Sequence, residues 1–244
     1  MVVDLLKELK MFGSLEFFLS LKEDYDEKDL IEILLKKEIE WKSENRKKRR
    51  LQSANFPWVK EWAEIDLSAN PQIPFNKIKK LSNGDFVSQK KNVCLIGPPG
   101  LGKTHCAVAL GRSLCEQGHT VRFYTAINLV NQLEEAKEEL RLSKLMDKIL
   151  SPSVLIIDEL GFVPFSDNGA RLLFDVFSKR YERGPIITTT NLDLPKWIQT
   201  FGSKELTTAL IDRFTHRCDI FVFGGASYRF MESKKEKSQE ISRI

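Results

Sequence analysis

A glycine-rich run with one lysine, GPPGLGKT at residues 97–104, contains the residue types best suited to chemistry on phosphate. Its glycines allow tight turns that present backbone N–H groups to phosphate oxygens, and a helix beginning there adds the positive end of its dipole. Lys103 would bridge the β and γ phosphates as a point charge, and the Thr104 hydroxyl would ligate Mg²⁺. An apolar strand before the run and a helical stretch after it disfavour the alternative, a chance match in an ordinary loop. We therefore expect bound ATP and Mg²⁺, held by Gly97, Pro98, Pro99, Gly100, Leu101, Gly102, Lys103, Thr104 and His105.

Two acidic residues, Asp158 and Glu159, end the apolar run VLIIDE at residues 154–159. Ligands of open α/β sheets bind at the carboxyl ends of the strands. Asp158 would hold Mg²⁺ through water, and Glu159 could orient and deprotonate the water that attacks the γ-phosphate. The alternative is a helix cap or a pair of surface acids after a buried strand. The pair favours hydrolysis over transfer to a small molecule.

A further apolar run, IITTTN, ends in Asn191. Its side-chain amide could bridge the γ-phosphate and the attacking water from the end of a neighbouring strand. Asparagine after a strand is also a common turn residue, so this assignment depends on the other two motifs.

These residues must be positioned by a parallel sheet covered by helices, because short apolar runs alternate with amphipathic segments of helical length. Crossover connections of this length indicate a doubly wound topology. The predicted strands are 93–96, 121–125, 154–158, 186–190 and 220–223, and the predicted helices are near 104–116, 127–149, 167–183 and 205–214.

The first part of the chain differs in character and predicts a separate helical domain. Apolar residues recur at helical spacing from Leu30 to Ile39, and a polar, highly charged stretch continues the same helix to Leu51. The run SANPQIPFN near residue 70 is typical of a linker. We therefore predict a helical domain over residues 1–70, for assembly and for DNA or partner binding, and an ATPase core over residues 71–244.

The distribution of basic residues suggests where a polyanion would bind. Residues 42–50 hold six basic side chains and one acid, although the formal net charge of the whole chain is only +4. Such a run can contact DNA phosphates without reading sequence, or it can be a solvated helix face. A second basic set lies at helical spacing within 137–148, but interleaved acids weaken it. The predicted DNA contacts are Arg46, Lys47, Lys48, Arg49, Arg50, Lys137, Arg141 and Lys144, with Lys148 extending the second set.

Composition excludes other classes of protein. The chain has 244 residues, of which 42% are hydrophobic and 30% charged, and no charge-free run exceeds 11 residues, so we expect no membrane span. The first ten residues mix acids and bases with apolar positions, unlike a secretory signal, which favours a cytoplasmic location. Four cysteines without a CxxC pair and three scattered histidines predict neither a disulfide framework nor a zinc or haem site.

With these motifs in place, the core resembles the AAA+ ATPases, in which phosphate loop, acidic strand end and sensor asparagine follow in this order. It is most similar to the IstB-like ATP-binding proteins of transposable elements, relatives of the DnaC helicase loaders. One departure is TTTN at 188–191, where that family would have a serine before the asparagine, but Thr190 keeps the hydroxyl group. The motifs that carry the resemblance, over most of the chain, are RRLQSANFP at 49–57, GPPGLGKTHCAVALG at 97–111, LIIDELGFVPF at 155–165, KRYERGPIITTTNL at 179–192, LTTALIDRFTHR at 206–217 and GASYR at 225–229.

The resemblance implies roles for two arginines. In similar proteins the DRF arginine, here Arg213, reaches the nucleotide of a neighbouring subunit, and the SYR arginine, here Arg229, senses the γ-phosphate. A guanidinium from a second subunit would neutralise charge in the transition state and couple hydrolysis to assembly. A structural role for Arg213 and a plain surface position for Arg229 stay open as alternatives. Because only 15 residues follow Arg229, we expect no C-terminal helical lid, as in this branch of the family.

The resemblance also implies a biological role. It predicts a DNA-binding regulator of transposition that forms a homo-oligomer on double-stranded target DNA, stimulates the transposase of its element and disassembles on hydrolysis. The alternative is a helicase loader in DNA replication, which would bind its helicase through residues 1–55. A small-molecule kinase fits less well, because such enzymes need a mobile lid over the acceptor and rarely combine an acidic pair with a sensor asparagine.

Overall fold

The computed structural model describes residues 2–21, 27–65 and 72–225. The chain divides into two compact units, Met1–Gln52 and Ser53–Ile244. The predicted domain boundary after residue 70 lies among residues 66–71, outside the described ranges, and stays a prediction. Within those ranges, no helix has the length and apolar character needed to cross a membrane.

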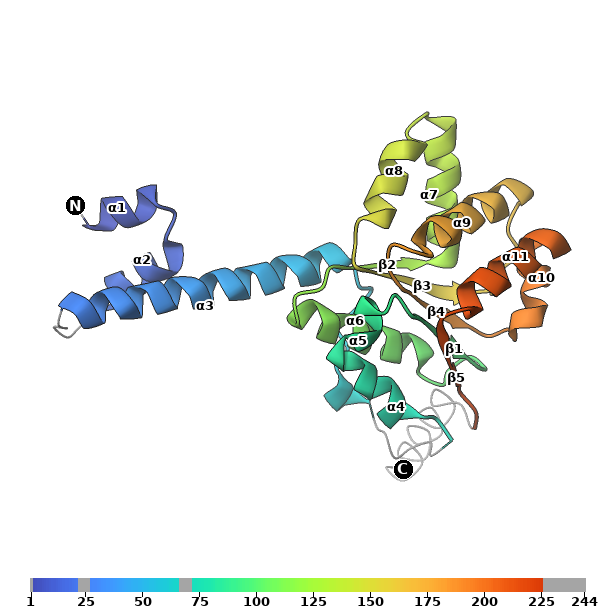
Figure 1. Cartoon of the computed structure of the whole chain (residues 1–244), viewed down its shortest axis with the longest axis horizontal. Coiled ribbons are helices and arrows are strands. Elements are labelled where there is room, and N and C mark those ends of the chain that lie inside the picture. The colour runs from blue at the N-terminus through green and yellow to red at the C-terminus, as the bar shows by residue number, and fades with distance from the viewer. Residues whose placement is uncertain (1, 22–26, 66–71, 226–244) are drawn as a thin grey trace, which may run out of the picture. The chain divides into compact units, whose positions relative to one another are not determined.

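The first unit is helical, with α1 (Val2–Glu8), α2 (Phe12–Ser20) and most of α3 (Glu27–Ala54) (Figure 1). Helix α2 lies directly against α3 at Gly13, where an added Cβ would be 2.2 Å from the Cβ of Trp41. The next residue, Ser14, donates its backbone N–H to Glu38 Oε2 at 3.1 Å. Glu38 is only 4% exposed, so this carboxylate fixes the start of α2 on α3.

The apolar positions of α3 are less buried than their helical spacing predicts. Ile31, Leu35 and Ile39 are 59%, 51% and 69% exposed, whereas Leu30, Ile33 and Leu34 are partly buried. These apolar positions therefore do not form one continuous buried stripe in the described unit. The physical reason is that α2 packs on the neighbouring face of α3, around Glu38.

The second unit contains a five-stranded sheet in the part of the chain that the structure describes, with strand order β2-β3-β4-β1-β5. All of its pairings are parallel, which confirms the predicted α/β class. The last strand begins earlier than predicted, at Cys218. The strands are β1 (Asn92–Ile96), β2 (Val121–Thr125), β3 (Val154–Leu160), β4 (Ile186–Thr190) and β5 (Cys218–Val222).

Helices cover the sheet (Figure 1). They are α4 (Phe75–Lys80), α5 (Asp85–Ser88), α6 (Lys103–Glu116), α7 (Ala126–Glu138), α8 (Leu142–Leu150), α9 (Asp167–Arg180), α10 (Ile198–Phe201) and α11 (Lys204–Thr215), with short 3-10 turns η1 (Trp62–Glu64), η2 (Leu81–Asn83) and η3 (Leu194–Trp197). Helix α6 packs closely on β3, because a Cβ on Gly111 would lie 2.8 Å from Ile156 Cδ1.

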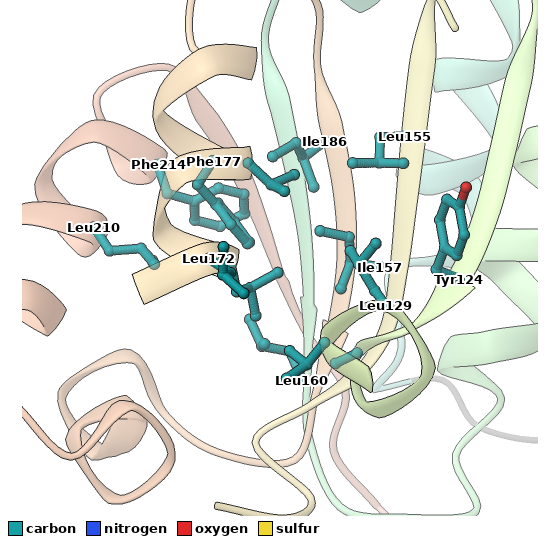
Figure 2. Close-up of a cluster of buried hydrophobic side chains, with 14 of the residues drawn as sticks. Tyr124, Leu129, Leu155, Ile157, Leu160, Leu172, Phe177, Ile186, Leu210 and Phe214 are labelled. Carbon is teal, nitrogen blue, oxygen red and sulfur yellow. The ribbon is translucent and has the colours of Figure 1, made fainter. Parts of the chain in front are cut away.

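An apolar cluster joins the sheet to α7, α8, α9 and α11. Figure 2 shows part of it, with Leu129 of α7, Leu172 and Phe177 of α9, and Leu210 and Phe214 of α11 beside the strands. Strand β3 contributes three fully buried residues to this cluster, Leu155, Ile157 and Leu160. Their spacing is two residues and then three, whereas side chains that share one face of a regular strand are separated by two. The strand must therefore contain an irregularity between Ile157 and Leu160.

The predicted helix over 127–149 is wrong, because it is two helices, α7 and α8, joined at Leu140. Leu140 has a φ of 56° and is 94% exposed. Its N–H donates to Lys137 O and the N–H of Arg141 donates to Ala136 O, which is the hydrogen-bond pattern that closes a helix with a left-handed residue. Glycine or asparagine usually occupies that position, so a leucine gave no signal of the break.

Candidate functional site

The phosphate loop connects β1 to α6, as predicted from its sequence. Gly97 follows β1 at a point where an added Cβ would be 2.3 Å from Phe223 O, so no side chain fits there. Gly100 and Gly102 have φ values of 80° and 83°, a left-handed conformation that glycine adopts without strain. The loop can therefore wrap closely and aim its N–H groups inward, at the N-terminal end of α6.

The ammonium group of Lys103 lies within this loop. Its Nζ donates hydrogen bonds to Gly97 O at 2.6 Å and Pro98 O at 2.8 Å. These carbonyl groups hold the positive charge where the phosphates of a nucleotide would lie. Lys103 thus has the position expected of the phosphate-bridging residue.

Thr104 and Asp158 form a pair of oxygen ligands beside the loop. The Thr104 hydroxyl donates to Asp158 Oδ1 at 2.9 Å. Asp158 is 3% exposed, and burial raises the pKa of its carboxyl group, while the hydrogen bonds from Thr189 and Thr104 lower it. Mg²⁺ prefers hard oxygen ligands and would compensate the buried carboxylate, so this pair fits the ion.

Glu159 occupies a bulge at the end of β3. Ile157 pairs with Thr188 and Leu160 pairs with Thr190, so two residues of β3 face a single residue of β4. Glu159 has a φ of 59°, an unusual value for a residue with a long side chain. The bulge lets neighbouring acids differ in environment, because Asp158 is buried whereas Glu159 is exposed and lines the adjoining cavity.

The cavity beside the loop has a volume of about 450 Å³. Part of its wall is aromatic, and the rings of Trp58 and His105 meet edge-on with centroids 6.0 Å apart. Phe75 also lines the cavity, whereas Ile78 of the same helix is fully buried in the core. The lining residues are Trp58, Lys60, Glu64, Ile65, Phe75, Pro99, Gly100, Leu101, Gly102, Lys103, Thr104, His105, Glu159, Phe162, Thr189, Thr190 and Asn191.

Sequence reasoning did not identify the segment that forms the apolar side of this cavity. Trp58 and Ile65 stand in a stretch without a helical or strand period, before the first strand of the sheet. The tryptophan beside Pro57 is a hint that the stretch carries, because Trp is enriched at interfaces, where it offers a large apolar ring and one N–H donor. Asn191, by contrast, follows β4 and lines the cavity as expected.

The predicted finger Arg213 is exposed on α11, outside the set of described residues that line the cavity. Its Nη1 donates to Ser178 Oγ at 2.6 Å, and its guanidinium group lies 5.3 Å from the centroid of the Phe174 ring. Arg213 therefore points along α9 and not toward the nucleotide site of its own chain. The predicted sensor Arg229 lies outside the described residues.

The predicted DNA contacts lie in two places. In α3, Arg46, Lys48 and Arg49 are exposed, whereas Lys47 and Arg50 are partly buried. The second set does not share one helix as predicted, because the break at Leu140 assigns its members to α7, the connecting turn and α8. Two of them also have polar partners: Lys137 donates to Asn168 Oδ1, and Arg141 forms an ion pair with Glu139.

Comparison with known proteins agrees with this geometry. The model of the family described as IstB-like ATP binding protein matches residues 18–238. The chain is 36% identical over 207 residues to the ATP-binding protein of insertion sequence IS5376 from Geobacillus stearothermophilus, which covers 85% of this chain and 82% of the relative. It is 37% identical over 198 residues to the corresponding protein of insertion sequence IS21 from Pseudomonas aeruginosa, covering 80% and 75%.

Solved structures share the fold of the second unit. The DnaC helicase loader matches with a TM-score of 0.53 and 21% identity, over 72% of this chain and 99% of that chain. DnaA from Aquifex aeolicus, solved with AMPPCP, matches with a TM-score of 0.60 and 16% identity, over 76% of this chain and 56% of that chain. The predicted AAA+ P-loop fold is therefore confirmed.

Proposed function

Since the chain belongs to the family of IstB-like ATP-binding proteins, we propose that it is an ATP-hydrolysing regulator of DNA transposition that assembles on target DNA. The observation that supports hydrolysis best is the meeting of Lys103, Thr104, Asp158 and Glu159 at one edge of the sheet. Lys103 and Thr104 are the first residues of α6, and Asp158 and Glu159 lie near the end of β3. They provide the charges that phosphoryl transfer to water needs.

Each residue of the proposed site has a distinct task. Lys103 would neutralise the phosphates, and Thr104 and Asp158 would hold Mg²⁺, which when bound would shield the negative charge of the β and γ phosphates. Glu159, exposed at the cavity, accepts the proton of the attacking water. Asn191 positions that water from the end of β4.

Arg213 supports an oligomeric form of the enzyme. Because it lies outside its own cavity and is held on the surface by α9, its guanidinium group is available to the site of a second copy. An arginine supplied in trans accelerates phosphoryl transfer by about 10³-fold or more. Hydrolysis would then require assembly, and Arg229 is proposed to sense the γ-phosphate.

Double-stranded DNA is the proposed scaffold for assembly, and the transposase of the same element is the proposed partner. The proteins of IS5376 and IS21 are named for insertion sequences, which motivates this choice. Exposed bases of α3, namely Arg46, Lys48 and Arg49, are suited to phosphate contacts that do not depend on sequence.

The test is the ATPase rate and particle size of the purified protein, with and without duplex DNA and Mg²⁺. We expect hydrolysis stimulated by DNA and large particles that form with ATP, and both should be lost in Lys103→Ala and Arg213→Ala. Glu159→Gln should instead bind ATP and stay assembled on DNA. A protein that remains monomeric with ATP and DNA would contradict the proposed assembly.

A helicase loader remains the second candidate, because the fold is shared with the DnaC helicase loader. The two proposals differ in the partner of the first unit. Pull-down with the full chain, using purified replicative helicase and purified transposase in parallel, separates them. Retention of the helicase and not of the transposase would favour the helicase loader over the regulator of transposition.

A further inference from the structure

A buried threonine, Thr189 of β4, contacts both acids of the proposed hydrolytic site. Its Oγ1 donates a hydrogen bond of 2.5 Å to Asp158 Oδ1. The same oxygen accepts the backbone N–H of Glu159 at 2.9 Å. Thr189 is 1% exposed, so no bulk water competes for these bonds.

The sheet register explains why one hydroxyl reaches both acids. Between the pairs Ile157–Thr188 and Leu160–Thr190, Thr189 is the single residue of β4 that faces the two bulged residues of β3. The bulge leaves the Glu159 N–H without a regular ladder partner, and the Thr189 hydroxyl takes that place. A backbone N–H can only donate and a carboxylate can only accept, so Oγ1 accepts from Glu159 and donates its own proton to Asp158.

We propose that Thr189 is a positioning residue for hydrolysis, which holds the Glu159 backbone in its left-handed conformation and ties it to Asp158. This inference rests on the proposed ATPase function and adds to it a residue that neither the motifs nor the composition singled out. In this proposal Thr189 acts through Asp158 and Glu159, although it also lines the cavity. It fixes the base relative to the residue that would hold Mg²⁺.

The consequence is a link between the two sides of the cavity. Asp158 is connected to the phosphate loop through Thr104, and Glu159 is connected to Asp158 through Thr189. Asn191 lies two residues after Thr189 on the same chain segment. The phosphate loop is therefore connected to the base, and to the end of β4, through the hydroxyl groups of Thr104 and Thr189.

The chain offers a matched control on the same strand. Thr188 is also fully buried, and its Oγ1 donates to Ile157 O at 2.8 Å, away from both acids. Thr188→Val and Thr189→Val each replace a hydroxyl by a methyl group and each remove buried hydrogen bonding, one bond at Thr188 and two at Thr189. A general loss of sheet stability would therefore affect both variants in a similar way.

The experiment compares wild type, Thr189→Val, Thr189→Ser and Thr188→Val as full chains. We expect Thr189→Val to lower kcat by about 10²-fold, because the base is misplaced. Its KM for ATP, and its affinity for a fluorescent ATP analogue, should stay close to those of Thr188→Val. Thr189→Ser should restore most of the rate, since it keeps the hydroxyl group.

Hydrogen exchange of the nucleotide-free protein gives a readout independent of activity. The Glu159 amide should exchange faster in Thr189→Val but keep its protection in Thr188→Val. Equal kcat in the two valine variants, or unchanged protection of the Glu159 amide, would overturn the inference. If the wild type itself does not hydrolyse ATP, the proposed function fails, whereas the exchange result still decides whether Thr189 holds Glu159.

Discussion

The guanidinium group of Arg213 lies 5.3 Å from the centroid of the Phe174 ring, and its Nη1 donates to Ser178 Oγ at 2.6 Å. Both partners belong to α9 and are one helical turn apart. Freezing an arginine side chain costs about 2 kcal/mol of conformational entropy. These two contacts offset that cost in the single chain. The Arg213 side chain is therefore already oriented before a second copy binds.

Replacing Phe174 with Leu should therefore reduce the preorganisation of the Arg213 side chain without altering the nucleotide site. The expected loss is about 0.5–1 kcal/mol for an exposed cation–π contact, which corresponds to roughly a two- to fivefold fall in the rate stimulated by assembly. The measurement is the dependence of ATPase rate on protein concentration with saturating DNA. Phe174→Tyr retains the aromatic ring and should behave as wild type. Equal rates for the Leu and Tyr variants would show that the ring of residue 174 does not orient Arg213.

Gly97→Ala should damage the nucleotide site more than the addition of one methyl group would suggest. The added Cβ would lie 2.3 Å from Phe223 O, a backbone atom next to β5, so the loop must move. We expect a loss of about 1–3 kcal/mol in the free energy of unfolding and a marked fall in affinity for ATP.

Gly118→Ala is the matched control, because Gly118 has a φ of 104° and no atom within 4 Å of an added Cβ. It should lose about 1–2 kcal/mol through backbone strain alone and bind ATP normally. Urea denaturation and titration with a fluorescent ATP analogue measure the two quantities. Normal ATP binding by Gly97→Ala would refute the steric argument.

Arg180→Met should destabilise the second unit by about 3 kcal/mol or more. The buried guanidinium donates to the backbone carbonyl groups of Leu150, Pro152, Ser153 and Pro185, and Met would leave these oxygens unsatisfied. Burial lowers the pKa of Arg180 to about 10, so the group is still charged at neutral pH. Urea denaturation at pH 7 is the measurement, and Arg183→Met, at an exposed position, should change stability little.

Changing Arg46, Lys48 and Arg49 together to Gln should reduce the salt dependence of DNA binding. If each base neutralises one phosphate, the slope of log K against log[salt] falls in magnitude by up to about 2.7. Fluorescence anisotropy with duplex DNA at several salt concentrations measures this slope. A control variant with the same change of charge replaces three exposed lysines of α4 with Gln, namely Lys77, Lys79 and Lys80. Equal slopes for the two triple variants would show that DNA does not contact the three bases of α3.

The sheet and the phosphate loop could be predicted because each depends on local signals. Apolar runs between Gly- and Asn-containing turns marked the strands, and the spacing of Gly97, Gly102 and Lys103 reflects what a backbone needs to surround phosphate. The acidic strand end was also predicted from position alone. The roles of these residues in hydrolysis stay predictions until they are measured.

Features that depend on packing between distant segments could not be predicted. Leu140 ends α7 in a conformation that its residue type does not suggest, and Arg180 looks in sequence like one more base in the charged run KRYER. Thr189 stood in a run of three threonines of similar appearance. Only the register between β3 and β4 distinguishes it from Thr188, and register is a property of the folded sheet.

The bulge in β3 also determines what a single deletion mutation could do to this protein. Glu159 is the surplus residue of that strand, because Ile157 and Leu160 already meet Thr188 and Thr190, with Thr189 left for Asp158. A one-residue deletion at Glu159 would produce a regular strand and keep Leu160 on its apolar face. The fold, the phosphate loop and the buried aspartate would survive. If Glu159 is the base, as proposed, this deletion variant should still bind nucleotide but should no longer hydrolyse it.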